Sequence, residues 1–457
     1  MTAPLIRRTY QISRTIYWNR EYRLPYAGRH PIGYQPTIAR TEVEMNSLAA
    51  QPAPASAAAA PRIEKGTTQF RRACWALFAA GFASFALLYC VQPMMPAFSA
   101  AFALNAAQSS LALSISTIAL AMGLLLTGPL SDAIGRKPVM VTALCAAALL
   151  TLLSPLVPGW HAFLLLRALL GLVLSGQVAV AMSYLSEEID PRHLGLAMGL
   201  YISGNSLGGM GGRLIGGVLL DFFSWQAALA ALGLLALLAA LTFWRLLPDS
   251  RHFQATPLSF ANLAHGLRLH FSDQGLPWLF LEAFLLVGSF VALFNYMSFR
   301  LLEPPYGLSM SLVGLLSVVY LSGTYSSTQA GALADRLGRH WVFWPSILLM
   351  LGGVLLTLCA PLGLVLAGML LFAFGFFAAH SLASSWVGRR ALQARGQASS
   401  LYLFSFYAGS SVAGTAGGFF WQHGGWTGVG LFIAALLGLA LIVALRLSRL
   451  PPKQALA

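Results

Sequence analysis

The sequence predicts an all-α membrane protein of twelve transmembrane helices, arranged as two pseudo-symmetric six-helix bundles. Three observations lead to this fold class: an apolar composition, a series of hydrophobic runs of membrane-spanning length, and a repeat that relates the two halves of the chain. Of the 457 residues, 57% are hydrophobic and 9% are charged, and the mean hydropathy is +0.71. Because soluble domains carry about 25% charged residues, this composition excludes an ordinary soluble protein.

Hydrophobic runs of about 20 residues recur from Cys74 onward, and each is long enough to cross a ~30 Å hydrocarbon core as a helix. The first run lies too far from the N-terminus, and is too long, to be a cleaved signal peptide. The predicted helices are 73–99, 109–130, 138–157, 161–185, 194–220, 225–247, 276–299, 309–333, 341–360, 362–386, 397–420 and 426–448.

These helices divide the chain into five segments. An Ala/Pro-rich stretch from Ala49 to Pro61 indicates that the N-terminal segment is a disordered, basic cytoplasmic tail. Its Arg-rich, acid-poor start is also compatible with an organellar transit peptide, although a cytoplasmic tail is the preferred interpretation. The predicted segments are the tail (1–72), the N-terminal bundle (73–247), a cytoplasmic linker (248–275), the C-terminal bundle (276–448) and a short cytoplasmic tail (449–457).

Basic residues indicate the orientation of the helices. Of the 28 Lys and Arg residues, 25 fall in the two tails and in alternate loops, whereas the opposite loops hold only Arg300. The other two, Arg167 and Arg213, lie inside predicted helices. The positive-inside rule therefore places both termini in the cytoplasm of a multi-pass inner-membrane protein. This asymmetry also accounts for the net charge of +14, so no nucleic-acid partner is expected.

The two halves of the chain contain related motifs. The segment GPLSDAIGRK, from Gly128 to Lys137, recurs as GALADRLGRH from Gly331 to His340, with five of ten residues identical. A second pair of segments, 195–217 and 396–418, shares glycines and a Leu-Tyr step. Parallel repeats about an axis along the membrane normal are typical of transporters in which two bundles rock against each other.

The motif at Gly128–Lys137 resembles the loop 2–3 signature of the major facilitator superfamily, and residues 73–448 are similar to its YnfM-type efflux permeases, which stand close to sugar-efflux and drug:proton antiporters. The resemblance implies that the loop aspartate engages the cytoplasmic end of helix 11 in the outward-facing state. A carboxylate favours the positive N-terminal end of a helix, which supports this role. The gating residues implied are Asp132, Gly135 and Arg136, with Asp335, Gly338 and Arg339 as weaker counterparts.

The fourth predicted helix carries Arg167 and Gly171, which resemble the R-x-x-x-G motif that the family associates with proton coupling. An arginine within a membrane span costs at least ~2.5 kcal/mol and so must face a cavity or a partner. Because helix 1 holds no acid, we expect the solute or a co-bound ion to present an anionic or accepting group to Arg167. A structural ion pair is the alternative.

Small residues recur every fourth position in two helices. Such ridges let helix backbones approach closely, and we expect them to form the sliding contact between the two halves, with static packing as the alternative. The ridge residues are Gly204, Gly208, Gly212 and Gly216 in the fifth helix, and Ser405, Gly409, Ala413 and Gly417 in the eleventh. Beside the first ridge, Arg213 is expected to pair with Asp221 or with a residue of the other half.

Other polar residues in the spans are candidates for the solute pathway or for interhelical hydrogen bonds. Glu282 is the one acid well inside a predicted span, and it either carries protons or extends to the cytoplasmic interface. The remaining candidates are Gln92, Gln177, Asn205, Asn295, Tyr320, His380, Tyr402 and Tyr407.

These features predict a transporter that exports a small organic solute by alternating access. No nucleotide-binding motif is present, so an ion gradient, with protons as the expected ion, or the solute's own gradient would supply the energy. Uptake, facilitated diffusion and a transporter-like sensor are the alternatives. The four cysteines stand singly, so we expect no metal and no cofactor. No catalytic constellation is present, and we expect a monomer in the lipid bilayer.

Overall fold

The computed structural model describes residues 61–253, 255 and 260–450, and the regular secondary structure of this part of the chain is entirely helical, without a β-strand. Ten of its helices are long and apolar enough to cross a membrane. One of these, α15 (Arg395–Ser448), contains two helices joined at Gly425, whose φ of 54° breaks the helix. A further helix, α7 (Leu194–Phe222), has 29 residues but many glycines. Together these give the twelve predicted spans.

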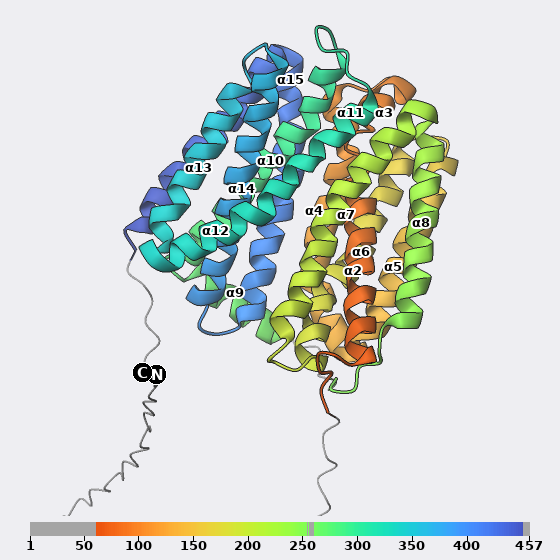
Figure 1. Cartoon of the computed structure of the whole chain (residues 1–457), viewed down its shortest axis with the longest axis vertical. Helices are drawn as coiled ribbons and strands as arrows, with labels where there is room; N and C mark the ends of the chain where they lie inside the picture. Colours follow the sequence, from red (N-terminus) through yellow and green to blue (C-terminus); the bar gives the residue numbers. More distant parts are fainter. Residues whose placement is uncertain (1–60, 254, 256–259, 451–457) are drawn as a thin grey trace, which may run out of the picture. The chain divides into compact units, whose positions relative to one another are not determined.

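The helices form two groups, which we call the N half and the C half (Figure 1). The N half comprises α2 (Thr68–Tyr89), α3 (Met95–Phe102), α4 (Ala106–Ile134), α5 (Arg136–Leu153), η1 (Ser154–Leu156), α6 (Trp160–Glu188), α7 and α8 (Trp225–Leu246). The C half comprises α10 (Leu276–Leu302), α11 (Met310–Leu315), η2 (Leu316–Tyr320), α12 (Leu321–Leu337), α13 (Arg339–Leu356), α14 (Leu362–Arg390) and α15. Helix α9 (Phe260–Phe271) lies between the halves in sequence.

Two ends of the helices are named here by their charge. The basic end carries the loops after α4, α6, α8, α12 and α14, and the charge-poor end carries the loops after α5, α7, α10 and α13. Near the basic end, Ile63 pairs with Ile189 in an isolated β-bridge and is buried. The helix that follows begins at Thr68, capped by Thr67, which is earlier than predicted. The remainder of the predicted tail, 1–60, and residues 451–457 lie outside the described residues.

The first predicted helix, 73–99, is not continuous. Helix α2 ends at Tyr89, the chain then turns through Cys90–Met94, and a second helix, α3, begins at Met95. Pro93 has no N–H to donate to the preceding turn, and its ring disfavours helical geometry at Gln92. The break leaves carbonyl groups at the end of α2 without helical partners.

The glycine ridge of α7 packs against α2 within the N half, so the prediction that it forms the contact between halves is wrong. Side chains at Gly204, Gly208 and Gly212 would overlap the backbone of Phe78, Phe82 and Ala86. The ridge of α15 likewise faces α10: Gly409 lies against Phe284 and Gly417 against Tyr296. Without a hydrophobic drive between helices in lipid, these close approaches are what hold each half together.

Candidate functional site

A cavity of about 690 Å³ lies between the two halves. The N half contributes residues of α2 and α7 to its walls, and the C half contributes α10, η2, α12, α14 and α15. Lining residues nearer the basic end, such as Ser203, Thr328 and Ser384, are exposed. Lining residues nearer the charge-poor end, such as Tyr89 and Arg213, are buried. The cavity therefore opens toward the basic end.

At the charge-poor end, Asp221 closes the space between the halves. Its two carboxylate oxygens accept hydrogen bonds from the backbone N–H groups of Met310 and Ser311, both at 2.9 Å. These are the first N–H groups of α11, where a helix carries a partial positive charge. The predicted pair between Arg213 and Asp221 does not form, because Asp221 instead caps a helix of the other half.

Two glycines bring the halves into backbone contact near this closure. Gly217 lies against the backbone of Met310 and Gly314, and Gly418 lies against Ala107. The two residues are 201 positions apart, the offset of the sequence repeat, so the contact has the pseudo-symmetry of the fold. In each Gly-Gly pair of the repeat, the first glycine packs within its own half and the second packs against the other half.

A polar contact crosses between the halves beneath this closure. Gln92, in the break after α2, donates from Nε2 to Oδ1 of Asn295 on α10 at 2.6 Å. The other end of the same amide, Oε1, accepts a hydrogen bond from Nε of Arg213. Both amide side chains are buried. Gln92 and Asn295 therefore act here as interhelical partners and do not line the cavity.

Arg213 lies at the closed end of the cavity and contacts both halves. In addition to Gln92, its Nη1 donates to the carbonyl of Gly209 at 2.5 Å. Its guanidinium group lies 4.3 Å from the ring centroid of Tyr89 and 4.9 Å from that of Tyr320. Because Tyr320 belongs to the C half, Arg213 does meet the other half, through cation–π contact.

Arg167 lies away from the cavity, contrary to the expectation that it meets the solute. It is 1% exposed, and its three nitrogens donate to backbone carbonyls: Nε to Ala112 at 2.9 Å, Nη1 to Leu87 at 3.1 Å and Nη2 to Leu88 at 2.9 Å. Leu87 and Leu88 belong to the last turn of α2, whose carbonyls the proline-induced break leaves free. A cation also complements the negative end of this helix.

The spacing of Arg167 and Gly171 follows from the packing of α6 on α4. A Cβ on Gly171 would overlap the backbone of Ser116, so the two helices approach as closely as a glycine permits. One turn earlier on each helix, this approach brings the Arg167 guanidinium to the carbonyl of Ala112. The motif thus builds a joint between α2, α4 and α6.

The repeated loop motif forms a turn and an ion-pair cluster at the basic end. Gly135 and Gly338 join consecutive helices with φ of 108° and 93°, which favours glycine. Arg136 is buried, pairs with Asp132, and binds Glu187 of α6 through Nη2 at 2.6 Å. Asp132 therefore bonds within its own half in this conformation.

The C-half counterpart of this cluster is looser. Asp335 is 3.7 Å from Arg339 and 3.4 Å from Arg389, and its side chain is 63% exposed. Nearby, α15 begins at Arg395 with no side-chain cap on its first turn. Because helix N-termini favour a carboxylate, a carboxylate could cap this end in another conformation.

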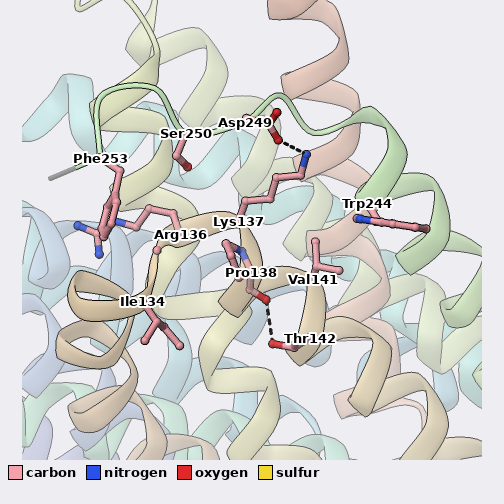
Figure 2. Close-up of a pocket in the computed structure, with 11 residues that line it drawn as sticks. Ile134, Arg136, Lys137, Pro138, Val141, Thr142, Trp244, Asp249, Ser250 and Phe253 are labelled. Atoms are coloured by element: carbon pink, nitrogen blue, oxygen red, sulfur yellow. Dashed lines mark hydrogen bonds and ion pairs between the residues drawn. The ribbon is translucent and has the colours of Figure 1, made fainter. Parts of the chain in front are cut away.

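The segment after α8 docks on the N half at the basic end (Figure 2). Lys137 donates to Asp249 at 2.6 Å, which holds the pKa of that carboxyl below its ordinary value. His252 bonds to Glu188 through both its backbone N–H and its ring. A hollow of about 520 Å³ lies beside these contacts, but Lys137 is already paired there. We regard it as a docking site for the linker.

A buried acid lies beside the cavity in the C half. Glu282 on α10 is fully buried, and neither carboxyl oxygen has a hydrogen-bond partner among the described residues. Tyr402 of α15 lies near enough for the charge of an ionised Glu282 to act on it, but no hydrogen bond joins the two; the Tyr402 hydroxyl is 2.9 Å from Nδ1 of His380 on α14. His380 lines the cavity. The Glu282 side chain is buried, so it does not reach solvent.

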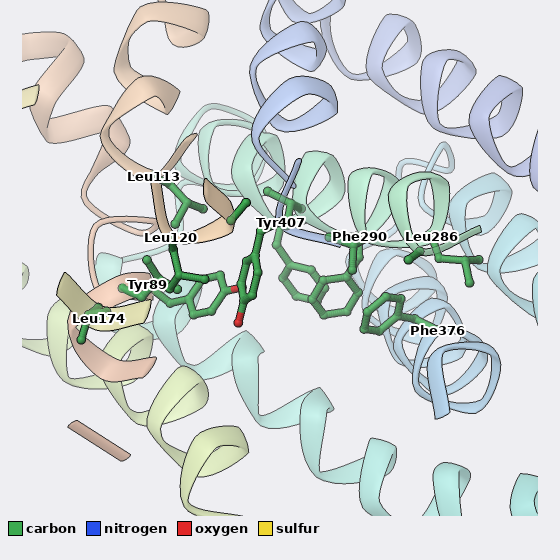
Figure 3. Close-up of a cluster of buried hydrophobic side chains, with 14 of the residues drawn as sticks. Tyr89, Leu113, Leu120, Leu174, Leu286, Phe290, Phe376 and Tyr407 are labelled. Atoms are coloured by element: carbon green, nitrogen blue, oxygen red, sulfur yellow. The ribbon is translucent and has the colours of Figure 1, made fainter. Parts of the chain in front are cut away.

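The structure thus brings Arg213 to the cavity wall together with three of the polar candidates: Asn205, Tyr320 and His380. Sequence reasoning missed the aromatic lining, formed by Phe85, Phe290, Phe376, Phe377 and Phe406. Figure 3 shows Phe290 and Phe376 on the C-half side, with Tyr89 and Tyr407 between the halves. Phenylalanine is concentrated in a few predicted spans, among them 276–299 and 362–386, and is absent from 109–130, 138–157, 194–220 and 309–333, so its uneven distribution was a signal that could have found this cluster.

Comparison with known families is consistent with this geometry. The sequence profile of the Major Facilitator Superfamily matches residues 77–328 and 302–457. The chain belongs to this superfamily. It is 60% identical over 387 residues to the "Inner membrane transport protein YnfM" of Escherichia coli (strain K12), covering 85% of this chain and 93% of that protein. It is 45% identical over 386 residues to the "Uncharacterized MFS-type transporter YybF" of Bacillus subtilis (strain 168), covering 84% and 95%.

Solved structures of the superfamily share the fold at low sequence identity. A bacterial homologue of the human lysosomal transporter Spinster, in an inward-facing and occupied conformation, has a TM-score of 0.71 and 14% identity, covering 86% of this chain and 100% of that one. The nucleoside transporter NupG has a TM-score of 0.68 and 17% identity, covering 82% and 99%. The chain is therefore a multi-pass inner-membrane transporter of the YnfM type with the major facilitator fold.

Proposed function

We propose that this superfamily member exports a small organic solute by alternating access, driven by protons. The observation that carries the proposal is a cavity lined by both halves and closed at one end only. A solute bound there contacts both bundles, so a rocking motion would carry it from one end to the other. Because one chain supplies both walls, a monomer suffices for this cycle.

The charge distribution gives the direction of opening. The positive-inside rule places the basic end, and with it both termini, in the cytoplasm. The cavity then opens to the cytoplasm, which is the conformation in which an exporter loads its solute. An uptake permease would release solute from the same conformation. Net accumulation of solute by inside-out vesicles would support export, and net depletion would support uptake.

The proton route that we propose runs from Glu282 through Tyr402 and His380 to the cavity. An ionised carboxyl buried without a partner is strongly disfavoured, so we propose that Glu282 carries a proton in this conformation. The Tyr402 hydroxyl and the His380 ring can both donate and accept, and His380 lines the cavity. Arg167 and Arg213 do not release protons in this role, because arginine stays charged in proteins.

Alternating access can be tested without knowing the solute. In a variant with the four native cysteines replaced, Ser327→Cys places a thiol in the cavity wall. An impermeant maleimide should label it from the basic end. Gly217→Ala inserts a methyl group against the backbone of Met310, so it should open the charge-poor end and permit labelling from that side.

The control for this experiment is Gly199→Ala on the same helix, which meets no atom within 4 Å and should leave the labelling unchanged. The same readout with Asp221→Asn tests the cap on α11. If Gly217→Ala and Asp221→Asn are both labelled from one side only, at every temperature tested, the result would contradict alternating access. It would favour the alternative that the protein is a transporter-like sensor.

The proton route predicts a pH dependence of the same labelling between pH 5 and 8. Glu282→Gln should abolish it, because the amide is neutral at all pH values. The carboxyls of Asp190 and Asp249 stay ionised in this range: hydrogen bonds from Arg192 lower the pKa of Asp190 to about 2, and Lys137 lowers that of Asp249. His252→Gln and His270→Gln are the controls, since each removes an imidazole that is not part of the proposed route. A pH response that persists in Glu282→Gln and disappears in a control would reject the route.

A further inference from the structure

The charge of the cavity wall comes from one residue. Among the described residues that line the cavity, Arg213 alone carries a formal charge, and no aspartate or glutamate lies among them. The other polar lining groups are hydroxyls, an amide and the His380 ring. A solute in this cavity therefore meets a positive field, with hydrogen-bond donors and acceptors but no carboxylate to hold a cation.

The Arg213 charge is not neutralised by its neighbours. Its contacts in the described chain are the Gln92 amide oxygen, the Gly209 carbonyl, and the rings of Tyr89 and Tyr320, all of which are uncharged. The guanidinium has five donors, and its hydrogen bonds to Gln92 and Gly209 use Nε and Nη1. A cation that is 5% exposed and lacks a counter-ion binds an anion more strongly than a solvated one would.

Arg167 provides an internal comparison. It is the other intramembrane arginine of the N half, but all three of its nitrogens already donate to carbonyls, and it does not line the cavity. Arg213 therefore combines three properties: it is buried, it has donor capacity in reserve, and it lies in the wall of the cavity.

The opposite wall of the cavity is aromatic. The rings of Phe290 and Phe376 are stacked with centroids 4.1 Å apart, and Phe290 lies 5.2 Å from the ring of Tyr320. Phe377 packs edge-on against Phe290 and Tyr320. Such a cluster favours a planar ring through stacked and edge-to-face contacts. The volume of about 690 Å³ falls within the range typical of small-molecule sites.

We infer that the cavity binds an aromatic organic anion, with Arg213 holding its carboxylate, sulfonate or phosphate and the Phe290–Phe376–Phe377 cluster holding its ring. This inference deepens the proposed transport function and rests on it. A neutral solute of the same shape would leave the Arg213 charge without a counter-ion, and a cationic one would be repelled by it.

The test uses 2-naphthalenesulfonate, which stays anionic across the physiological pH range, and its neutral sulfonamide of the same shape. Binding to the purified full-length protein is measured by calorimetry. The sulfonate should bind at least about tenfold more tightly than the sulfonamide, in line with charge-assisted hydrogen bonds. Arg213→Gln should weaken sulfonate binding by about 10- to 100-fold and leave the sulfonamide unchanged. Arg446→Gln removes an exposed arginine stacked on Trp278, outside the cavity, and should change neither.

A second pair of variants keeps Arg213 intact. Thr324 is an exposed residue of the cavity wall, so changes there should leave folding undisturbed. Thr324→Asp places a carboxylate in the cavity and should weaken sulfonate binding by about tenfold. Thr324→Asn, of nearly the same shape, should not. If the two variants bind the sulfonate equally, the electrostatic basis of the inference is overturned.

The outcomes separate this inference from the proposed function. Equal binding of sulfonate and sulfonamide to the wild-type protein would overturn the anion preference, even if thiol labelling still shows alternating access. Equal binding of the sulfonate by wild type and a folded Arg213→Gln would also overturn it. Selective sulfonate binding that depends on Arg213, in a protein that never exposes Ser327→Cys at the charge-poor end, would sustain the binding site while contradicting transport.

Discussion

The two intramembrane arginines of the N half show how far single residues can be interpreted from sequence. Both Arg167 and Arg213 lie in apolar runs, and both must find acceptors, although only Arg213 has an acid, Asp221, on its own helix within a few turns. The hydropathy of the sequence does not show whether the acceptor of a buried arginine is a backbone carbonyl or a bound solute. The distinguishing signal was Pro93, which ends α2 early and exposes the carbonyls that Arg167 binds.

At this scale we predict that Arg167→Lys destabilises the fold. An ammonium is a compact point charge and cannot reach three carbonyls on two helices as the planar guanidinium does. Losing two hydrogen bonds and leaving buried acceptors unsatisfied should cost about 2–4 kcal/mol, seen as a lower melting temperature. Binding of 2-naphthalenesulfonate, measured below the melting transition, should be retained. An unchanged melting temperature together with lost binding would return Arg167 to solute recognition.

At the scale of helices, the hydrophobic runs located every span, because lipid requires about 20 apolar residues for each crossing. The neighbours of each helix were not predictable in the same way. The sequence shows the ridge on α7 as Gly204, Gly208 and Gly212. A four-residue spacing places these glycines on one face of the helix, but it does not identify the neighbouring helix that packs against that face. The structure shows that α2 covers it, and that the contact between halves uses Gly217, one residue beyond the ridge.

The matched glycines of α7 give a prediction about helix packing. Gly208→Ala would place a methyl group onto the backbone of Phe82, whereas Gly199→Ala would place one in open space. Overpacking against a backbone costs about 1–3 kcal/mol, which exceeds the ~0.5–1 kcal/mol that alanine gains over glycine in a helix. Gly208→Ala should therefore melt at a lower temperature than wild type, and Gly199→Ala at the same or a higher one. Equal melting of the two variants would show that α2 and α7 are not in close contact.

At the scale of the whole molecule, the two sequence repeats correspond to two kinds of contact. The Gly-Gly pairs hold the halves together at the charge-poor end. The loop motifs hold ion pairs at the basic end, each within one half. The sequence indicated a gating role for Asp132 but not the conformation in which it acts. The hydropathy of the chain and the spacing of its motifs do not change between the conformations of a transport cycle. Here Asp132 pairs with Arg136, and the first turn of α15 has no side-chain cap.

The final prediction concerns the balance between these conformations. Asp132→Asn should raise the fraction open at the basic end, and Ser384→Cys in the cavity wall would report it as faster labelling from that side. In the open state the variant loses one partly exposed ion pair worth about 0–1 kcal/mol, and Arg136 keeps its bonds to Glu187. In the closed state it loses the charge that we expect to cap α15, worth about 0.5–2 kcal/mol. The closed state therefore loses more free energy than the open state.

The matched control is Asp335→Asn, which should have a smaller effect because the Asp335 carboxylate lies 3.4 and 3.7 Å from its arginine partners. Slower labelling of Asp132→Asn than of wild type would mean that the ion pair with Arg136 stabilises the open state more than the helix cap stabilises the closed state. Asp132 would then favour the open state, contrary to the predicted gating role.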